Sequence, residues 1–298
     1  MRKDGAQKTE FISDTLSTLI KTGDNTFFTF SPSSLFLLQV QPFSVEELPF
    51  SGTLHALPMP EEQNPEGNSI VLITQQSVTL FDLSLRSARH QMPFSSNQII
   101  QFATQISPSS IAFCSQTTLF YWDLNKKVFL SHSLSTNIQE QKISSLATVN
   151  LHTTRHYPII LISTFTELHL FQLKNNEIVN HSLVNCLNLE NANANITSQG
   201  FKQIVTTNSP YLLLLRESWQ SVQLVQVKFN FYKKNFCVLP VFTFKGPTYP
   251  LQAVFFHKSC FSSVSNRNLT YFYDFECHRH VRSFLDLLLE GNSKFVDK

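Results

Sequence analysis

The segment Leu119-Phe120-Tyr121-Trp122-Asp123-Leu124 decides the fold class, because it is an apolar and aromatic run that ends in one polar and one apolar residue. Aromatic and β-branched residues in short runs of this kind favour β-strands. The same theme reads LFLLQV at 35–40, VTLFDL at 78–83, LHLFQL at 168–173, VQLVQV at 222–227 and LTYFYDF at 269–275. The sequence therefore indicates a repeated β-structure.

The spacing of the polar residue in this theme predicts the size of the repeat. The marker residues are Gln39, Asp82, Asp123, Gln172, Gln226 and Asp274. Successive markers lie 43, 41, 49, 54 and 48 residues apart, which brackets the roughly 40 to 50 residues of a four-stranded propeller blade. We predict an all-β fold, a β-propeller of about six four-stranded blades, and seven blades stay open as an alternative.

The repeats extend along the whole chain, so we expect a single propeller domain over residues 1–298. The expected blades span approximately residues 11–50, 53–94, 98–134, 143–184, 199–244 and 249–289. Continuous apolar runs, such as YPIILIS and YLLLLRE, predict strands that are covered on both faces. Near the C-terminal end, VRSFLDLLLEGN permits either a final strand or a short helix capped by Gly291.

The segment 119–124 resembles the strand that carries the Trp-Asp signature of WD-repeat propellers, and the marker spacing agrees with that family. Asp82 and Asp274 keep the acidic position of the signature. The markers that depart from it are Gln39, Gln172 and Gln226. The Gly-His dipeptide that usually opens such a repeat is absent, so we expect the hydrogen-bond tetrad of the family not to form. The resemblance implies a scaffold like the propellers of nucleolar pre-ribosomal complexes, nuclear pores and vesicle coats.

The composition limits the partners and the cellular compartment that we expect for the protein. Net charge is +2 and the sequence pI is about 8.2. The chain therefore lacks the excess of positive charge that attracts a protein to nucleic acid. The five cysteines show no metal-ligand spacing, which favours free thiols in a reducing compartment. No apolar run is long enough for a membrane span, and no apolar stretch follows the first charges. We expect an intracellular protein, not secreted, with the nucleus or nucleolus favoured over the cytoplasm.

The sequence contains no recognised catalytic or cofactor motif. Seven glycines supply little material for a phosphate-binding loop. The sharpest metal candidate is Cys277-His278-Arg279-His280, but on a strand these side chains would alternate between two faces. We therefore predict no enzyme, no cofactor, no metal and no small-molecule substrate. The scattered carboxylates Glu140, Glu167, Glu177 and Glu217 keep a propeller hydrolase as a remote alternative.

Two basic segments are candidate interaction sites. In Lys228–Phe236 (KFNFYKKNF) cations and aromatics interleave, which could neutralise phosphates and stack bases. The favoured alternative is a β-hairpin whose aromatics lie in the core and whose lysine pair forms the turn. A second cluster lies at residues 279–282. The candidate residues are Lys228, Lys233, Lys234, Arg279 and Arg282.

The sequence thus predicts a non-enzymatic scaffold subunit of a larger intracellular complex, nuclear or nucleolar and ribosome-biogenesis-like. We expect it to bind other protein subunits and not to bind a membrane. The low charge, 15% of residues, and the aromatic excess support a surface that is held among partners. The alternatives are an RNA-contacting subunit that uses the basic segments, a cytoplasmic coat or adaptor propeller, and a propeller hydrolase.

Overall fold

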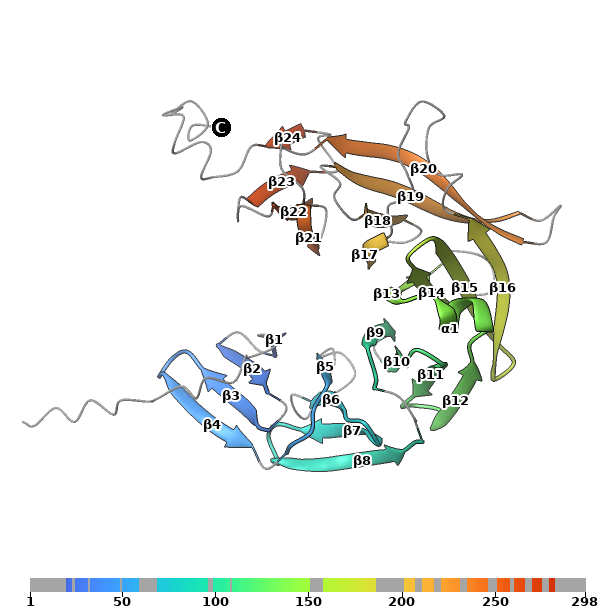
Figure 1. Ribbon diagram of the computed structural model, residues 1–298. Helices are drawn as coiled ribbons and strands as arrows, with labels where there is room; N and C mark the ends of the chain where they lie inside the picture. The colour runs from blue at the N-terminus through green and yellow to red at the C-terminus, as the bar shows by residue number, and fades with distance from the viewer. Residues whose placement is uncertain are drawn as a thin grey trace, which may run out of the picture. The chain divides into compact units, whose positions relative to one another are not determined.

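The protein is built almost entirely from β-strands, as the computed structural model in Figure 1 shows. The structure describes residues 20–22, 25–31, 33–48, 50–58, 69–95, 99–107, 109–150, 158–185, 201–206, 211–216, 221–230, 235–245, 251–257, 260–265, 270–274 and 279–281. Within these ranges the strands form six four-stranded antiparallel sheets. The chain divides into two compact units, residues 1–97 (unit 1) and 98–298 (unit 2).

Unit 1 holds two sheets, and in each of them the strands follow chain order. The first sheet contains β1 (Ile20–Lys21), β2 (Thr26–Phe30), β3 (Leu35–Gln39) and β4 (Ser44–Leu48). The second contains β5 (His55–Pro58), β6 (Ser69–Ile73), β7 (Ser77–Asp82) and β8 (Ser87–Pro93). The first strands of the two sheets, β1 and β5, lie in contact, as expected of neighbouring blades.

Unit 2 holds four sheets of the same order. The third sheet contains β9 (Phe102–Ser107), β10 (Ser110–Cys114), β11 (Thr118–Asp123) and β12 (Val128–Ser133). The fourth contains β13 (Ile143–Asn150), β14 (Pro158–Thr164), β15 (Glu167–Lys174) and β16 (Glu177–Asn185). The fifth contains β17 (Phe201–Thr206), β18 (Tyr211–Arg216), β19 (Ser221–Asn230) and β20 (Asn235–Lys245). The sixth contains β21 (Leu251–His257), β22 (Cys260–Ser265), β23 (Thr270–Asp274) and β24 (Arg279–Val281).

The second strands of the second to fifth sheets, β6, β10, β14 and β18, are mostly apolar and lie in the core. Ile159 to Ile162 of β14 and Leu212 to Leu215 of β18 are at most 1% exposed. Each of these strands has a neighbour in its own sheet on both sides, and packed side chains cover both of its faces. This confirms that the continuous apolar runs form buried strands.

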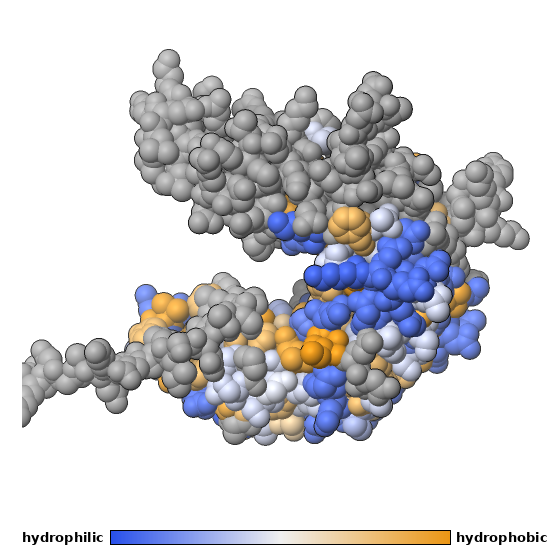
Figure 2. Space-filling view, in the orientation of Figure 1, coloured by the Kyte–Doolittle hydropathy of each residue, from blue (hydrophilic) through white to orange (hydrophobic). Residues whose placement is uncertain are grey.

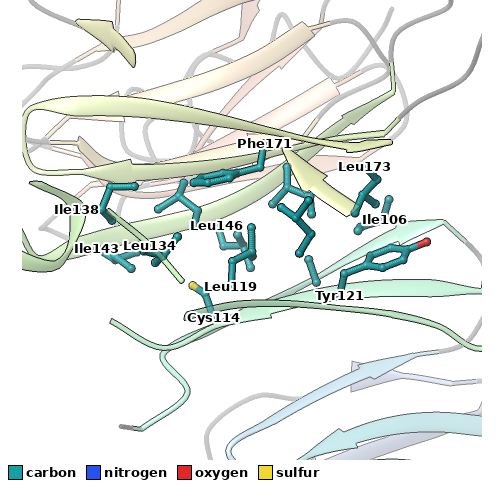
Figure 3. Close-up of a cluster of buried hydrophobic side chains, with 14 residues drawn as sticks. Ile106, Cys114, Leu119, Tyr121, Leu134, Ile138, Ile143, Leu146, Phe171 and Leu173 are labelled. Carbon is teal, nitrogen blue, oxygen red and sulfur yellow. The ribbon is translucent and has the colours of Figure 1, made fainter. Parts of the chain in front are cut away.

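The core between the third and fourth sheets is drawn in Figure 3. Leu119 and Tyr121 of β11 and Cys114 of β10 face Leu146 of β13 and Phe171 of β15 in one buried cluster. Burial raises the pKa of the Cys114 thiol to about 12, so this thiol stays protonated at neutral pH. Cys114 is therefore a buried free cysteine that serves packing, as predicted for it.

The marker residues occupy equivalent places in all six sheets. Each is on the third strand and pairs with the first or second residue of the second strand. The pairs are Gln39 with Thr26, Asp82 with Ser69, Asp123 with Ser110, Gln172 with Ile159, Gln226 with Tyr211 and Asp274 with Cys260. The repeat that was read from the sequence is therefore the structural repeat of the fold.

A Ser or Thr hydroxyl closes the turn between the second and third strands in the first four sheets. Such a side chain accepts from the backbone N–H three residues further on and so satisfies a buried donor. The pairs are Ser31 with Ser34 (3.1 Å), Thr74 with Ser77 (3.0 Å), Ser115 with Thr118 (3.2 Å) and Thr164 with Glu167 (3.2 Å). Each hydroxyl stands eight residues before its marker. The sequence analysis did not find this second repeated position.

The linker between the third and fourth sheets contains α1 (Thr136–Glu140), a helix of five residues that was not predicted. The Gln116 amide, from the β10–β11 turn, donates to the carbonyls of Ile138 (3.1 Å) and Gln139 (3.2 Å). From the fourth sheet, Thr164 donates to the side-chain carbonyl of Gln141 (2.7 Å). The second-to-third strand turns of both sheets therefore hold one linker and lie at the same end of unit 2.

In the part of the chain that the structure describes, no helix is long and apolar enough to cross a membrane. The alternative of a C-terminal helix concerns residues 282–292, which lie outside the described residues.

Replacing Gln116 tests the linker contacts. Gln116→Ala leaves the linker carbonyls without this donor, so we expect the free energy of unfolding to fall by about 1 to 3 kcal/mol. The matched control is Gln76→Ala, an exposed glutamine of the β6–β7 turn, for which we expect a change within about 0.5 kcal/mol. Urea unfolding monitored by Trp122 fluorescence measures both. Equal effects of the two substitutions would contradict the role given to Gln116.

Candidate interaction surface on the strand turns

In the second and third sheets the marker binds the turn between the third and fourth strands. Asp82 Oδ1 accepts from the backbone N–H groups of Ser84 (2.7 Å) and Leu85 (2.9 Å). In the next sheet Asp123 Oδ1 accepts from the N–H of Lys126 (2.9 Å). Both aspartates are buried, and carboxylates that bind backbone donors in this way fix the turn.

Electrostatics reinforce the Asp82 turn. Burial alone would raise the pKa of Asp82, but the N–H donors of Leu85 and Ser84 and an ion pair with Arg89 outweigh it, so the pKa lies below its usual value. The carboxylate is therefore charged in the folded protein down to low pH. The marker binds the backbone N–H groups of the turn. The side chains at the tip are therefore not needed to stabilise the turn and can contact another molecule.

The turn tips of unit 1 are apolar and exposed. Phe43 is 68% exposed, Leu85 is 66% exposed and Val40 is 49% exposed. Val40 and Phe43 belong to the β3–β4 turn and Leu85 to the β7–β8 turn. We call these three residues the apolar turns. Figure 2 shows hydrophobic residues at the surface of unit 1 near the β3–β4 turn.

The two third-to-fourth strand turns of unit 2 that the structure describes, β11–β12 and β15–β16, are polar. Arg86 and Lys127 take the same place after their markers, and both have φ of 54°. The β11–β12 turn exposes Asn125, Lys126 and Lys127, and the β15–β16 turn exposes Lys174, Asn175 and Asn176. The turn geometry therefore does not require apolar tips. Their presence in unit 1 needs another cause, and exposed apolar groups of this kind mark contacts with other proteins.

An ion pair joins the two apolar turns. Arg86, next to Leu85, donates from Nε and Nη2 to the two carboxylate oxygens of Glu46 on β4, at 2.8 and 2.7 Å. The hydrogen bond from Arg86 lowers the pKa of Glu46. Both side chains are well exposed, so the pair contributes little to stability, about 0 to 1 kcal/mol. Its effect is to hold the β7–β8 turn against β4 in a fixed position.

The sequence-predicted candidates lie on unit 2. Lys228 is an exposed residue near the end of β19, and Arg279 is the first residue of β24, paired with Asp274. Lys233, Lys234 and Arg282 lie outside the described residues. Phe236, an aromatic of the same hairpin, is 4% exposed, which agrees with the core role given to the hairpin aromatics. The functional role of these cations stays a prediction.

The described residues contain no group of three or more His, Cys, Asp and Glu side chains that could hold a metal. Of the candidate motif Cys277-His278-Arg279-His280, only Arg279 and His280 are described, as neighbours on β24. Among the scattered carboxylates, Glu167 lies near the buried His169. Burial lowers the pKa of His169 to about 4, which keeps this imidazole neutral within the core.

Neither a protein-family model nor a curated protein matches the chain. Solved structures do match it. The Cps50 (Swd1) β-propeller domain of Myceliophteria thermophila aligns with a TM-score of 0.62 and 12% identity, over 91% of this chain and 86% of that chain. Hsv2 of Kluyveromyces lactis aligns with a TM-score of 0.55 and 9% identity, over 88% and 76%. The fold is a β-propeller. At these identities the likeness concerns the fold alone.

The Asp82 turn predicts a pH-dependent stability. Asp82→Asn removes the charge that Arg89 and the turn N–H groups bind, so we expect a loss of about 1.5 to 3 kcal/mol at pH 7. A depressed carboxylate pKa stabilises the fold above the unfolded pKa of about 3.9 and loses that effect as pH falls through the folded value. Urea unfolding at pH 7 and at about pH 3 should therefore show a smaller difference between the two proteins at low pH. A difference that does not depend on pH would contradict this account of Asp82.

Proposed function

We propose that the protein is a non-enzymatic scaffold that binds a protein partner through the apolar turns of unit 1. The observation that carries the proposal is a contrast between equivalent turns: they are apolar and exposed in unit 1, whereas the β11–β12 and β15–β16 turns of unit 2 are polar. Turn tips that project from a rigid sheet are well placed for recognition, because the scaffold rather than the partner fixes their position. The antiparallel sheets supply that rigidity, and the exposed ion pair between Glu46 and Arg86 links the β7–β8 turn to β4.

The partner chemistry follows from the patch. Phe43 and Leu85 present two apolar groups beside a charge pair that neutralises itself. The complementary surface is an apolar pocket or helix face of another subunit, rimmed by groups that can hydrogen-bond to the exposed Glu46 and Glu47. The setting that we propose is a nuclear or nucleolar complex of the ribosome-biogenesis kind, supported by the resemblance of the Trp-Asp strand to divergent propellers of such assemblies.

The decisive experiment replaces Phe43 and Leu85 by serine in the tagged full-length chain. We expect the double variant to lose its stoichiometric protein partners, because losing apolar anchors costs about 2 kcal/mol or more, roughly thirtyfold in affinity. Affinity purification from the native cells, with proteins and RNA both identified, measures the loss and names the complex.

The control is Phe165→Ser, which removes another exposed phenylalanine (44% exposed) from the β14–β15 turn of unit 2. It should retain the partners of the unaltered protein. Thermal unfolding should show that all variants remain folded, because the changed side chains are exposed. Full partner recovery with the double variant, or recovery of the unaltered chain alone at low and high salt, would overturn the proposal.

A further inference from the structure

The third-to-fourth strand turns of unit 2 carry lysines on three neighbouring sheets. Lys126 and Lys127 are on the β11–β12 turn, Lys174 precedes the β15–β16 turn and Lys228 is near the end of β19. All four are exposed. We call them the lysine turns. The sequence analysis singled out only Lys228 among them.

These turns lie at the same end of unit 2. The second-to-third strand turns of the third and fourth sheets hold the α1 linker from one side, so in antiparallel sheets the third-to-fourth strand turns lie at the opposite end. Thr148, near the end of β13, donates to the carbonyl of Gln105, near the end of β9 (3.1 Å). These first strands therefore run in the same direction.

The fifth sheet follows the same arrangement. Ser145 of β13 accepts from the N–H of Ile204 in β17 (3.2 Å). The outer strands β12, β16 and β20 are in contact in that order and follow one another along unit 2 in Figure 1. β12 and β16 begin after the turns that carry Lys127 and Lys174, and Lys228 pairs with Cys237 near the start of β20. The cations of three sheets therefore lie near the starts of successive outer strands.

The charges differ between the two ends. The lysine turns bring four cations together with two carboxylates, Asp123 and Glu177. The ammonium of Lys126 lies 3.4 Å from Asp123, whereas Lys127 and Lys174 make no ion pair with another described residue. From α1 to the start of β15, the charged residues that the structure describes are Lys142, Glu140 and Glu167. Hydrophilic residues cover the area around α1 in Figure 2.

We propose that the lysine turns bind an acidic segment, rich in Asp and Glu, of a partner protein. A row of solvated ammonium groups on successive blades suits an extended chain that places a carboxylate on each of them. A single-stranded RNA would also need exposed aromatic platforms. Phe236, the aromatic of the β19–β20 hairpin whose packing the structure describes, is buried. This surface is on unit 2, and its function does not depend on the apolar turns of unit 1.

The test uses the full chain with a fluorescent peptide of alternating Glu and Asp, and an oligouridine RNA of similar charge, both measured by anisotropy at low and moderate salt. Lys127→Glu combined with Lys174→Glu should weaken peptide binding about tenfold or more, because repulsion replaces attraction. The neutral pair Lys127→Ala with Lys174→Ala should give an intermediate loss. Lys142→Glu, at the linker end, should change binding less than about twofold.

Circular dichroism and thermal unfolding check that the variants remain folded, and the Ala pair serves as the readout if the Glu pair does not fold. Failure of the unaltered chain to bind the peptide, or equal losses with Lys142→Glu and the Lys127 and Lys174 variants, would overturn the proposal. Tighter binding of the RNA than of the peptide at the same salt would overturn the assignment to a protein partner. The Phe43 and Leu85 variants should bind the peptide normally, so failure of one proposal is distinguishable from failure of the other.

Discussion

The fold depends on satisfying the backbone groups of turns that join strongly apolar strands. A strand such as β10 is buried over Ser110 to Cys114. Its apolar side chains cannot form hydrogen bonds with the backbone groups of the turn that follows. An unpaired buried N–H would cost about 1 to 3 kcal/mol. The protein solves this with two side chains, a hydroxyl at the end of the second strand and a polar marker at the end of the third. In the second sheet these are Thr74 and Asp82.

The residues that stabilise the turns are therefore different from the residues that can contact a partner. Asp82 is buried beneath the β7–β8 turn, while Leu85 projects from it. In the next sheet Asp123 takes the same buried place and Lys126 and Lys127 project. One backbone shape thus presents an apolar group in unit 1 and cations in unit 2. The chemistry of each surface is set by two or three tip residues.

The fold was largely predictable because its repeated features correspond to repeated patterns in the sequence. The markers, the four strands of each repeat and the continuous apolar runs such as YPIILIS all correspond to elements of the structure. The hydroxyl between the second and third strands was not recognised, because Ser and Thr are common throughout this chain. The signal that could have found Ser31, Thr74 and Ser115 is their constant spacing of eight residues before the marker. A helix as short as α1 leaves no periodic pattern, and its position depends on Gln116, which is distant in sequence.

The candidate surfaces were less predictable, because they combine residues from different sheets. Glu46 and Arg86 are forty residues apart, and neither stands out in its own segment. Lys127 and Lys174 come to the same end of unit 2 only through the contact of β12 and β16. An exposed Phe43 looks like any other phenylalanine among 28 until its burial is known. Sequence patterns predict contacts within a repeat, whereas sites between repeats require the three-dimensional arrangement.

In the second and third sheets the hydroxyl and the marker bind turns of their own sheet, and this has an evolutionary consequence. A duplicated segment of about forty residues would bring both turn-forming side chains with it and would need nothing from its neighbours to form its hairpins. Copies could then diverge freely at every position except the apolar strands and these two polar sites. A gene built in this way can come to contain six blades with almost no recognisable identity among them, while natural selection reshapes one turn tip at a time.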